Sequence, residues 1–328
     1  MMMLDVAVIG VGLAGISAAA KCQKQGLNIQ LFDKSRGVGG RLATRRGFET
    51  RFDHGLPCWQ IQGDRTQKLT EILLAENILK PWQVANTNAN NPSAWETLDV
   101  EQAYVAPEGM TAIAKYLARD LTINRSYHLE KISAKSAHWE LTFKNGEVVA
   151  AAALMLAVPC PQAIPLVQDF VTLEIGDRLN KISYEPALSL MLGFKELNLK
   201  FPWQELRLTN HPIFKKIILD GQKRSPQAST LVVQTNLAFA AQNLDTDNLA
   251  PAAQKIITEL QTILDLSEPI WHQIHRWRYA LTQEVLGKSH LTLPTNLPLI
   301  LCGDWCLGNG IEGAIASGTE AADHFLKT

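Results

Sequence analysis

The sequence lacks an excess of either charge. Its 328 residues include 31 Lys and Arg against 32 Asp and Glu, which gives a formal net charge of −1. Binding to nucleic acid or to an anionic membrane by bulk charge needs a basic excess, so we expect neither partner. Charged residues form only 19% and hydrophobic residues 46% of the chain, which excludes a disordered polar protein and indicates about two folded domains.

Cysteine is also scarce. The five cysteines are odd in number, and no two are spaced as Cys-x-x-Cys. A disulfide framework and a structural zinc site are therefore not expected, and we predict no metal. This usage of cysteine favours a reducing, cytoplasmic location.

A continuous apolar span is missing as well. Residues 148–168 carry no charge over a membrane-spanning length, but Pro159, Pro161 and Pro165 interrupt them, so we interpret the stretch as a buried strand followed by a turn. Residues 1–20 end in small residues, but Asp5 stands where a signal peptide carries basic charge. Neither segment predicts a membrane or secretory protein.

Apolar runs alternate with helical spacing along the chain, which is typical of an α/β protein. No internal repeat is visible, and residues 86–93 have the composition of a polar loop. We predict strands over residues 4–9, 28–32, 139–143, 148–158, 188–194, 230–235, 271–279 and 294–302, and helices over 13–25, 66–78, 109–121, 249–264 and 310–326.

The first strand runs into a glycine-rich turn, Gly10-Val11-Gly12-Leu13-Ala14-Gly15, and Asp33 closes the second strand eighteen residues later. In this context the glycines are a dinucleotide-binding fingerprint, which by itself does not separate NAD from FAD. Gly10 permits the tight turn, Gly12 lets backbone approach a pyrophosphate, and Gly15 lets helix and strand pack closely. The helix N-terminus favours phosphate, and Asp33 would accept from the adenosine ribose.

A second glycine-rich loop follows at once, with the sequence Arg36-Gly37-Val38-Gly39-Gly40-Arg41. Adjacent glycines expose successive N–H groups to an anion, and the two arginines match phosphate oxygens. A simple NAD domain does not need this loop, whereas an extended flavin dinucleotide does. A basic surface turn is the alternative interpretation.

These motifs together resemble a known family. The spacing of the two glycine loops, Asp33-Lys34 and Asp53-His54-Gly55 is similar to that of the flavin amine oxidase superfamily. Further blocks are similar to those of renalase and its bacterial relatives, and the match is densest at the two ends of the chain. These blocks are Tyr104 to Met110, Leu156 to Pro159, Arg276 to Tyr279, Gly303 to Cys306, Glu312 to Ala314 and Ser317-Gly318.

The resemblance implies a Rossmann-like FAD-binding domain of the GR2 type, assembled from residues 1–80, 103–162 and 288–328. A smaller α+β substrate domain, residues 81–102 and 163–287, would be inserted in it. The monoamine oxidase signature with its flavin-bonding Cys is absent from the sequence, so we expect non-covalent FAD.

An acid beside a glycine at the carboxyl end of the last strand, Gly303-Asp304, is well placed for a sugar-like hydroxyl, and in the family this Asp holds the ribityl chain. The small residues of the following helix would admit the ring system. The predicted cofactor-binding residues are Gly10, Gly12, Leu13, Ala14, Gly15, Asp33, Lys34, Arg36, Gly39, Gly40, Arg41, Asp53, His54, Gly55, Gly303, Asp304, Glu312, Gly313 and Ala314.

The substrate side is predicted from residues 271–279, where alternation places Trp277 and other aromatic residues on one face of a strand and two arginines on the other. Such a face suits a planar nicotinamide or phosphates. His54 would titrate near neutrality if unperturbed and serve as an acid or base. Tyr184 and Trp59 are candidates for the pocket wall, and the predicted catalytic residues are His54, Tyr184, Trp277 and Gln234.

The chain departs from the renalase pattern in two places. Leu56-Pro57-Cys58-Trp59 follows Gly55 where relatives carry Ala-Gln-Tyr, and Gln234 stands where relatives carry His. The resemblance implies hydride transfer from a dihydronicotinamide isomer (2- or 6-dihydro-NAD(P)) to flavin N5, with reoxidation by O₂ to H₂O₂. The departures leave open a flavin oxidase of amines or other C–H donors, or an FAD-binding protein without turnover.

Overall fold

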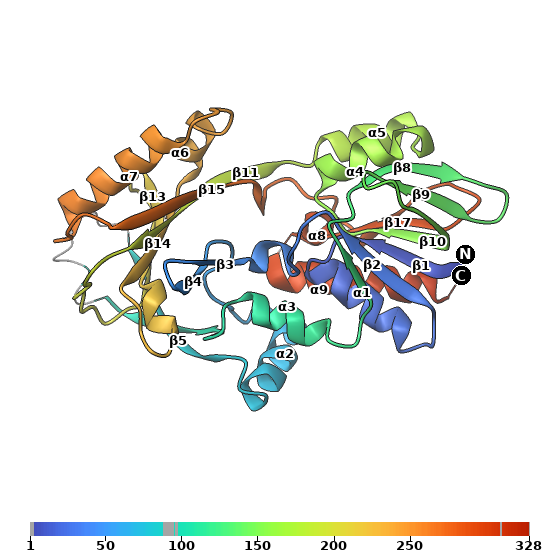
Figure 1. Cartoon of the computed structure of the whole chain (residues 1–328). Coiled ribbons are helices and arrows are strands. Elements are labelled where there is room, and N and C mark those ends of the chain that lie inside the picture. Colours follow the sequence, from blue (N-terminus) through green and yellow to red (C-terminus); the bar gives the residue numbers. More distant parts are fainter. Residues whose placement is uncertain (1–2, 88–94, 96–97, 309, 328) are drawn as a thin grey trace.

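Two large β-sheets organise the chain in the computed structural model, which describes residues 3–87, 95, 98–308 and 310–327 (Figure 1). The first sheet has the strand order β16-β17-β10-β1-β2-β7, and β8 and β9 continue from β10. Its strands are β1 (Leu4–Ile9), β2 (Ile29–Asp33), β7 (Ile123–Arg125), β8 (Leu129–Ala134), β9 (Trp139–Phe143), β10 (Val148–Leu156), β16 (His290–Thr292) and β17 (Leu299–Cys302).

Five neighbouring strands of this sheet, β17, β10, β1, β2 and β7, run parallel. Strands from both ends of the chain thus lie in one sheet, and the two chain ends lie side by side in Figure 1. Since parallel strands end at a common edge, the loops after β1, β2 and β17 meet there. The predicted α/β class and the Rossmann-like domain built from discontinuous segments are confirmed.

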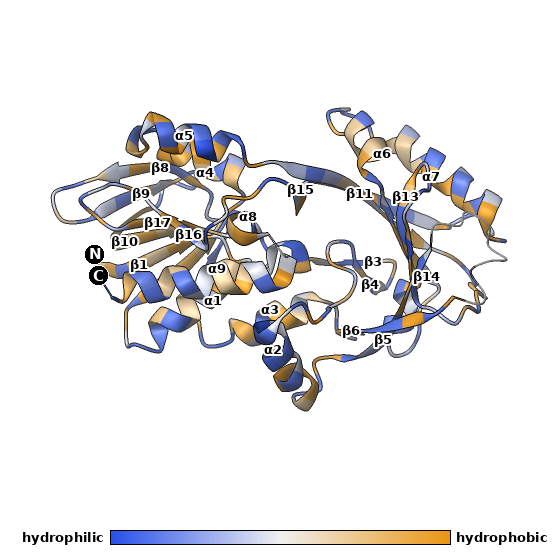
Figure 2. Ribbon diagram, turned by 180° about the vertical axis from the view of Figure 1, so that it is seen from behind, coloured by the Kyte–Doolittle hydropathy of each residue, from blue (hydrophilic) through white to orange (hydrophobic). Residues whose placement is uncertain are grey.

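Both faces of the first sheet are covered, which explains why its strands are nearly all apolar (Figure 2). Val6 and Val8 face a core shared with helices α1 (Leu13–Gln23) and α9 (Gly310–Phe325). Ala7 and Ile9 face a second core, which includes residues of α4 (Cys160–Val167) and α5 (Leu173–Asn180). Further helices are α2 (Asp64–Ala75), α3 (Thr111–Leu117) and α8 (Asp304–Leu307).

The second sheet has seven strands in the order β15-β11-β14-β13-β12-β5-β6. Helices α6 (Leu237–Gln242) and α7 (Ala250–Ile263) contribute to a core on one of its faces. A two-stranded ribbon of β3 (Thr44–Gly47) and β4 (Thr50–Asp53) lies between the two large sheets in Figure 1. The strands are β5 (Lys80–Thr87), β6 (Val100–Val105), β11 (Tyr184–Gly193), β12 (Glu205–Leu208), β13 (Phe214–Ile218), β14 (Thr230–Thr235) and β15 (Trp271–Thr282).

Three local predictions need correction. The turn expected after residue 158 is wrong, because α4 and α5 follow instead; Pro161 occupies the first turn of α4, where its missing N–H costs nothing. The strand expected over 294–302 is confined to β17. Asn86 and Thr87 belong to β5 rather than to a polar loop, while positions 88–93 of that predicted loop lie outside the described residues.

The predicted division into domains places residues 163–183 in the inserted part, yet Ala163, Val167 and Leu179 are buried in a core of the first sheet. The domain boundaries remain a prediction. Within the described ranges, no helix combines the length and the apolar character that crossing a membrane requires.

Candidate functional site

The turn after β1 has the backbone that the fingerprint predicts. Gly10 has φ of +103°, which favours glycine. A Cβ atom at Gly15 would lie 2.0 Å from the carbonyl oxygen of Gly10, so helix α1 packs too closely for any side chain there. At Gly12, by contrast, an added Cβ would meet no described atom within 4 Å. The chain itself leaves this space open at the start of α1, where no side chain caps the free N–H groups.

The second glycine loop lies against the first. Gly39 has φ of +101° and donates its N–H to Val11 O at 2.7 Å. A Cβ at Gly40 would lie 3.5 Å from the Cα of Gly12. Both loops therefore border the open space at Gly12, as expected for a pyrophosphate reached from two sides.

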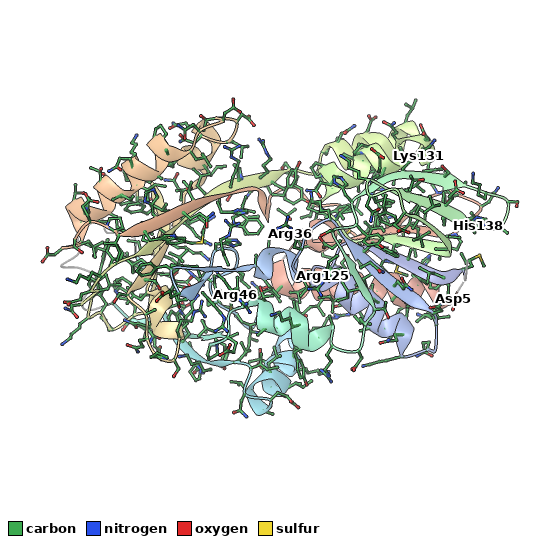
Figure 3. All side chains as sticks on the ribbon, in the orientation of Figure 1. Asp5, Arg36, Arg46, Arg125, Lys131 and His138 are labelled. Atoms are coloured by element: carbon green, nitrogen blue, oxygen red, sulfur yellow. The ribbon has the colours of Figure 1, made fainter. Side chains whose placement is uncertain are left out.

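Asp33 ties the end of β2 to this turn. Its carboxylate accepts from the N–H of Val11 at 2.8 Å and from that of Ser35 at 2.7 Å. Lys34 donates to Gln162 on α4 at 3.0 Å. Arg36, after β2, and Arg125, at the end of β7, lie exposed at the same edge of the first sheet (Figure 3). The ribose contact predicted for Asp33 remains a prediction.

Arg41 and Asp304 join the two ends of the chain. The two guanidinium nitrogens donate to the two carboxylate oxygens at 2.8 and 2.6 Å, and a third bond runs from Arg41 to Ala280 O at 3.2 Å. Thr282 also donates to Asp304 at 3.0 Å, and Gly303 N donates to Ser317 on α9. A bidentate ion pair of this kind fixes both side chains.

Helix α9 carries the other predicted C-terminal residues. Gly313, Ala314 and Gly318 are buried, and a Cβ at Gly318 would lie 2.0 Å from Ala14 O on α1. Glu312 is predicted to bind the cofactor, but its carboxylate accepts hydrogen bonds within the protein. The donors are the N–H groups of Arg65 and Thr66 at the start of α2, at 3.1 and 2.8 Å. The described geometry thus gives Glu312 the part of a helix cap.

Asp53 lies in a buried cluster of four charges. Its carboxylate contacts Lys223 Nζ at 3.2 Å and Arg224 at 2.9 Å, and both cations also contact Asp220 at 2.8 and 3.1 Å. Burial alone would raise the pKa of Asp53, but the two cations outweigh it and hold that pKa below its usual value. Asp220 is close to both cations in the sequence, but no local pattern predicts that Lys223 and Arg224 also contact Asp53, which lies 170 and 171 positions away from them.

His54 is part of an aromatic cluster. Its ring stacks on His275 with centroids 4.6 Å apart and meets the edge of Trp277 at 5.4 Å, while Trp277 Nε1 donates to His54 O at 2.8 Å. Burial, together with the neighbouring His275 and Arg45, lowers the pKa of His54 to about 3. Burial and Arg45 bring the pKa of His275 to about 4. His54 would titrate near neutrality only if unperturbed, and that condition does not hold, because the site keeps both imidazoles uncharged.

The other predicted substrate-side residues, Gln234, Tyr184 and Trp59, lie in three different surroundings. Gln234, on β14, donates its Nε2 to Gly55 O at 2.5 Å, so it belongs with the His54 cluster. Tyr184 accepts from Cys160 N at 3.1 Å and contacts the ring of Tyr279 at 5.2 Å. Trp59 is wrong as a pocket wall, because it is fully buried in the core and donates to Thr70 Oγ1.

This geometry defines an α/β dinucleotide-binding protein whose nucleotide loops adjoin an inserted sheet with an aromatic cluster. Residues 65–326 match the family model described as flavin containing amine oxidoreductase, and residues 8–73 match an NAD(P)-binding Rossmann-like domain. The first match covers well over half of the chain. The chain belongs to the flavin-containing amine oxidoreductases.

Solved structures show the same fold. The chain is similar to putrescine oxidase bound to putrescine (TM-score 0.75, 13% identity) and to a provisionally assigned protoporphyrinogen oxidase from Exiguobacterium sp. 255-15 (TM-score 0.71, 14% identity), with 100% of each chain covered in both cases. It is 27% identical over 178 residues to acetone monooxygenase (methyl acetate-forming) of Gordonia sp. (strain TY-5). That alignment covers 51% of this chain and only 28% of the monooxygenase.

Membership of this family identifies FAD as the cofactor, and the described residues are suited to bind it. The open space at Gly12, the adjoining Gly39–Gly40 turn and the free N–H groups of α1 suit a pyrophosphate. Arg41 and Asp304 form their ion pair where the N- and C-terminal segments meet. We name the space bordered by these residues the cofactor seat. We propose that the other predicted cofactor residues line it, apart from Glu312, which caps α2, and that FAD is held without a covalent bond.

Proposed function

We propose that the protein is an FAD-dependent oxidoreductase that oxidises a reduced planar small molecule, with a 2- or 6-dihydro isomer of NAD(P) as the first candidate. When bound, FAD supplies the two-electron chemistry, taking a hydride from the substrate at N5 and being reoxidised by O₂ to give H₂O₂. The substrate would leave as ordinary oxidised NAD(P). The candidate substrate comes from the resemblance to renalase.

The aromatic cluster of His54, His275 and Trp277 carries the proposal. The stacked imidazoles of His54 and His275 meet the Trp277 ring edge-on, at interplanar angles of 82° and 70°, and both imidazoles are uncharged. The nearby Gly55–Leu56 peptide contacts the cofactor loop, since Leu56 N donates to Arg41 O at 2.7 Å. A planar substrate ring can pack against the faces and edges of such an aromatic cluster. Hydride removal from a dihydronicotinamide needs no protein base, so the low pKa values of both histidines do not oppose the reaction.

The test mixes the FAD-loaded protein anaerobically with each dihydro isomer and with ordinary 4-dihydro-NAD(P) as a control. We expect the flavin band at about 450 nm, where oxidised flavins absorb, to bleach with the 2- or 6-isomer, and the pyridine product to be oxidised NAD(P). On admission of air, the band should return with formation of H₂O₂. A band that persists with all isomers defeats this choice of substrate.

Oxidation of an amine is the second candidate, favoured by the family match over residues 65–326. A panel of primary amines and polyamines, assayed for H₂O₂ and for flavin bleaching, separates it from the first. If no donor of either class reduces the bound flavin, a flavin-binding protein without turnover is the remaining hypothesis.

A further inference from the structure

The segment Asp53–Cys58, which we name the bridging segment, crosses the strands of the second sheet. Five residues of this sheet are paired directly from strand to strand and therefore share one face: His275, Ser189, Gln234, Lys216 and Arg207. The bridging segment lies on this face. His54 stacks on His275, Gly55 O accepts from Gln234, and Cys58 Sγ contacts Arg207 at 3.4 Å.

The opposite side of the bridging segment touches the cofactor loop. The N–H of Leu56 donates to Arg41 O at 2.7 Å, and a Cβ at Gly55 would lie 2.1 Å from that same oxygen. The guanidinium of Arg41 in turn holds both oxygens of Asp304. The contact is too close for the bridging segment to shift without moving Arg41.

A single peptide group carries this connection. The carbonyl of Gly55 and the N–H of Leu56 belong to the same rigid plane, so Gln234 binds one end of the group and Arg41 the other. A hydrogen bond to the carbonyl also polarises the N–H of that peptide and strengthens its bond to the next acceptor. Both places where the chain departs from the renalase pattern, Gln234 and residues 56–59, thus meet at one contact.

We infer that Gln234 is a positioning residue that fixes the cofactor seat through the Gly55–Leu56 peptide and Arg41, rather than a group that acts on the substrate. From the second sheet, Gln234 fixes the position of the Arg41 backbone. The ion pair between Arg41 and Asp304 in turn fixes the position of the C-terminal segment. The inference concerns FAD binding and does not depend on the proposed substrate.

The matched experiment compares Gln234→Leu with Gln204→Leu. Gln204 also forms one hydrogen bond from its side-chain amide to backbone, although as the acceptor, from Gln83 N at 3.1 Å, and among the described residues it does not touch the bridging segment. FAD-free protein is titrated with FAD and followed by protein fluorescence. We expect Gln234→Leu to bind FAD about five- to tenfold more weakly, the effect of one hydrogen bond, and Gln204→Leu to stay within about twofold of the wild type.

A second variant, Gln234→Glu at pH 7.5, keeps the volume of the side chain but replaces the donor with an acceptor facing Gly55 O. We expect Gln234→Glu to bind FAD at least as weakly as Gln234→Leu does. If the leucine variant fails to fold, the comparison of Gln234→Glu with the wild type provides the test. Equal FAD affinity for wild type and Gln234→Glu would overturn the inference. So would a Gln234→Leu variant that binds FAD normally and loses only its reduction by a donor, because Gln234 would then act on the substrate.

Discussion

Arg41 and Asp304 lie 263 positions apart in the sequence and form a bidentate ion pair at 2.6 and 2.8 Å. Asp304 is 8% and Arg41 35% exposed, so the pair is shielded from water on the side of the acid. One partner follows the second glycine loop, and the other begins α8 directly after β17. Their contact joins the N-terminal and C-terminal halves of the cofactor seat.

Replacing Asp304 should therefore weaken FAD binding. Asp304→Ala removes an acceptor of the cofactor seat and leaves the Arg41 guanidinium with its hydrogen bond to Ala280 O. We expect the FAD dissociation constant to rise about ten- to hundredfold. The control is Glu320→Ala, which breaks the more exposed pair with Arg65 and should leave FAD binding unchanged. Equal effects of the two substitutions would contradict the role of Asp304.

Gly12 should tolerate a side chain in the free protein but not in the complex. Its φ of −85° and ψ of 179° suit valine, and no described atom lies within 4 Å of the added Cβ. Gly12→Val is thus expected to melt near the wild-type Tm without FAD and to bind FAD more than about a hundredfold less tightly.

Gly318→Ala is the opposite case. Its Cβ would lie 2.0 Å from Ala14 O, so α1 and α9 must move apart, and we expect a loss of about 1–3 kcal/mol of stability with or without FAD. Thermal melts of both variants with and without FAD separate the two effects. A Gly12→Val protein with full flavin occupancy would refute the pyrophosphate assignment.

Removal of Lys223 should be severely destabilising. Lys223→Met leaves Asp53 and Asp220 buried with Arg224 as their remaining cation, and the expected loss is about 3–5 kcal/mol. Lys215→Met, which breaks the partly exposed pair with Glu185, should lose less than about 1 kcal/mol. Urea unfolding of the two variants measures the difference.

The penalty of Lys223→Met should depend on pH. The pKa of Asp53 in the folded protein is below its ordinary value of 3.8, so its pairing stabilises the fold above that value and is lost as pH falls through the folded pKa. The pKa of Lys223 is raised above 10.5 because Asp220 and Asp53 outweigh its burial, so its contribution is lost only as pH rises beyond that value. The difference from wild type should shrink as pH falls into the range where the buried carboxylates of the variant, no longer held by Lys223, take up protons, and shrink again as pH rises beyond 10.5.

His54 should make folding less favourable in mild acid. Its pKa is about 3 in the folded protein against an ordinary 6.5, so between these values the unfolded chain binds a proton that the folded chain does not. Stability therefore falls as pH drops from 6.5. We expect His54→Gln to flatten the decline of Tm between pH 6.5 and pH 4.5. Parallel curves for wild type and variant would show that His54 is not held neutral by the fold.

Local patterns were sufficient to predict the nucleotide half of the fold. The strand, turn and helix of residues 4–23 follow from neighbouring residues alone, and the glycines of that turn have the packing and backbone that their positions predict. Helix α4 was missed because Pro161 and Pro165 were interpreted as breakers, although a proline in the first turn of a helix is tolerated.

The contacts that shape the substrate side could not be predicted in the same way. Asp53, on β4, meets Lys223 and Arg224 only through tertiary packing, because β4 pairs with β3 and Lys223 ends a short helix at residues 220–223. The pKa of His54 is set by burial and by His275 and Arg45 from other parts of the chain. Such properties depend on tertiary packing, for which a single sequence has no periodic signal.

Titration of the FAD-free protein with FAD, followed by the visible absorption of the flavin, tests the central claim most directly. The account predicts saturation at one FAD per chain, a flavin band altered from that of free FAD, and release of intact FAD on denaturation. A chain that stays folded but leaves the spectrum of added FAD unchanged would contradict it.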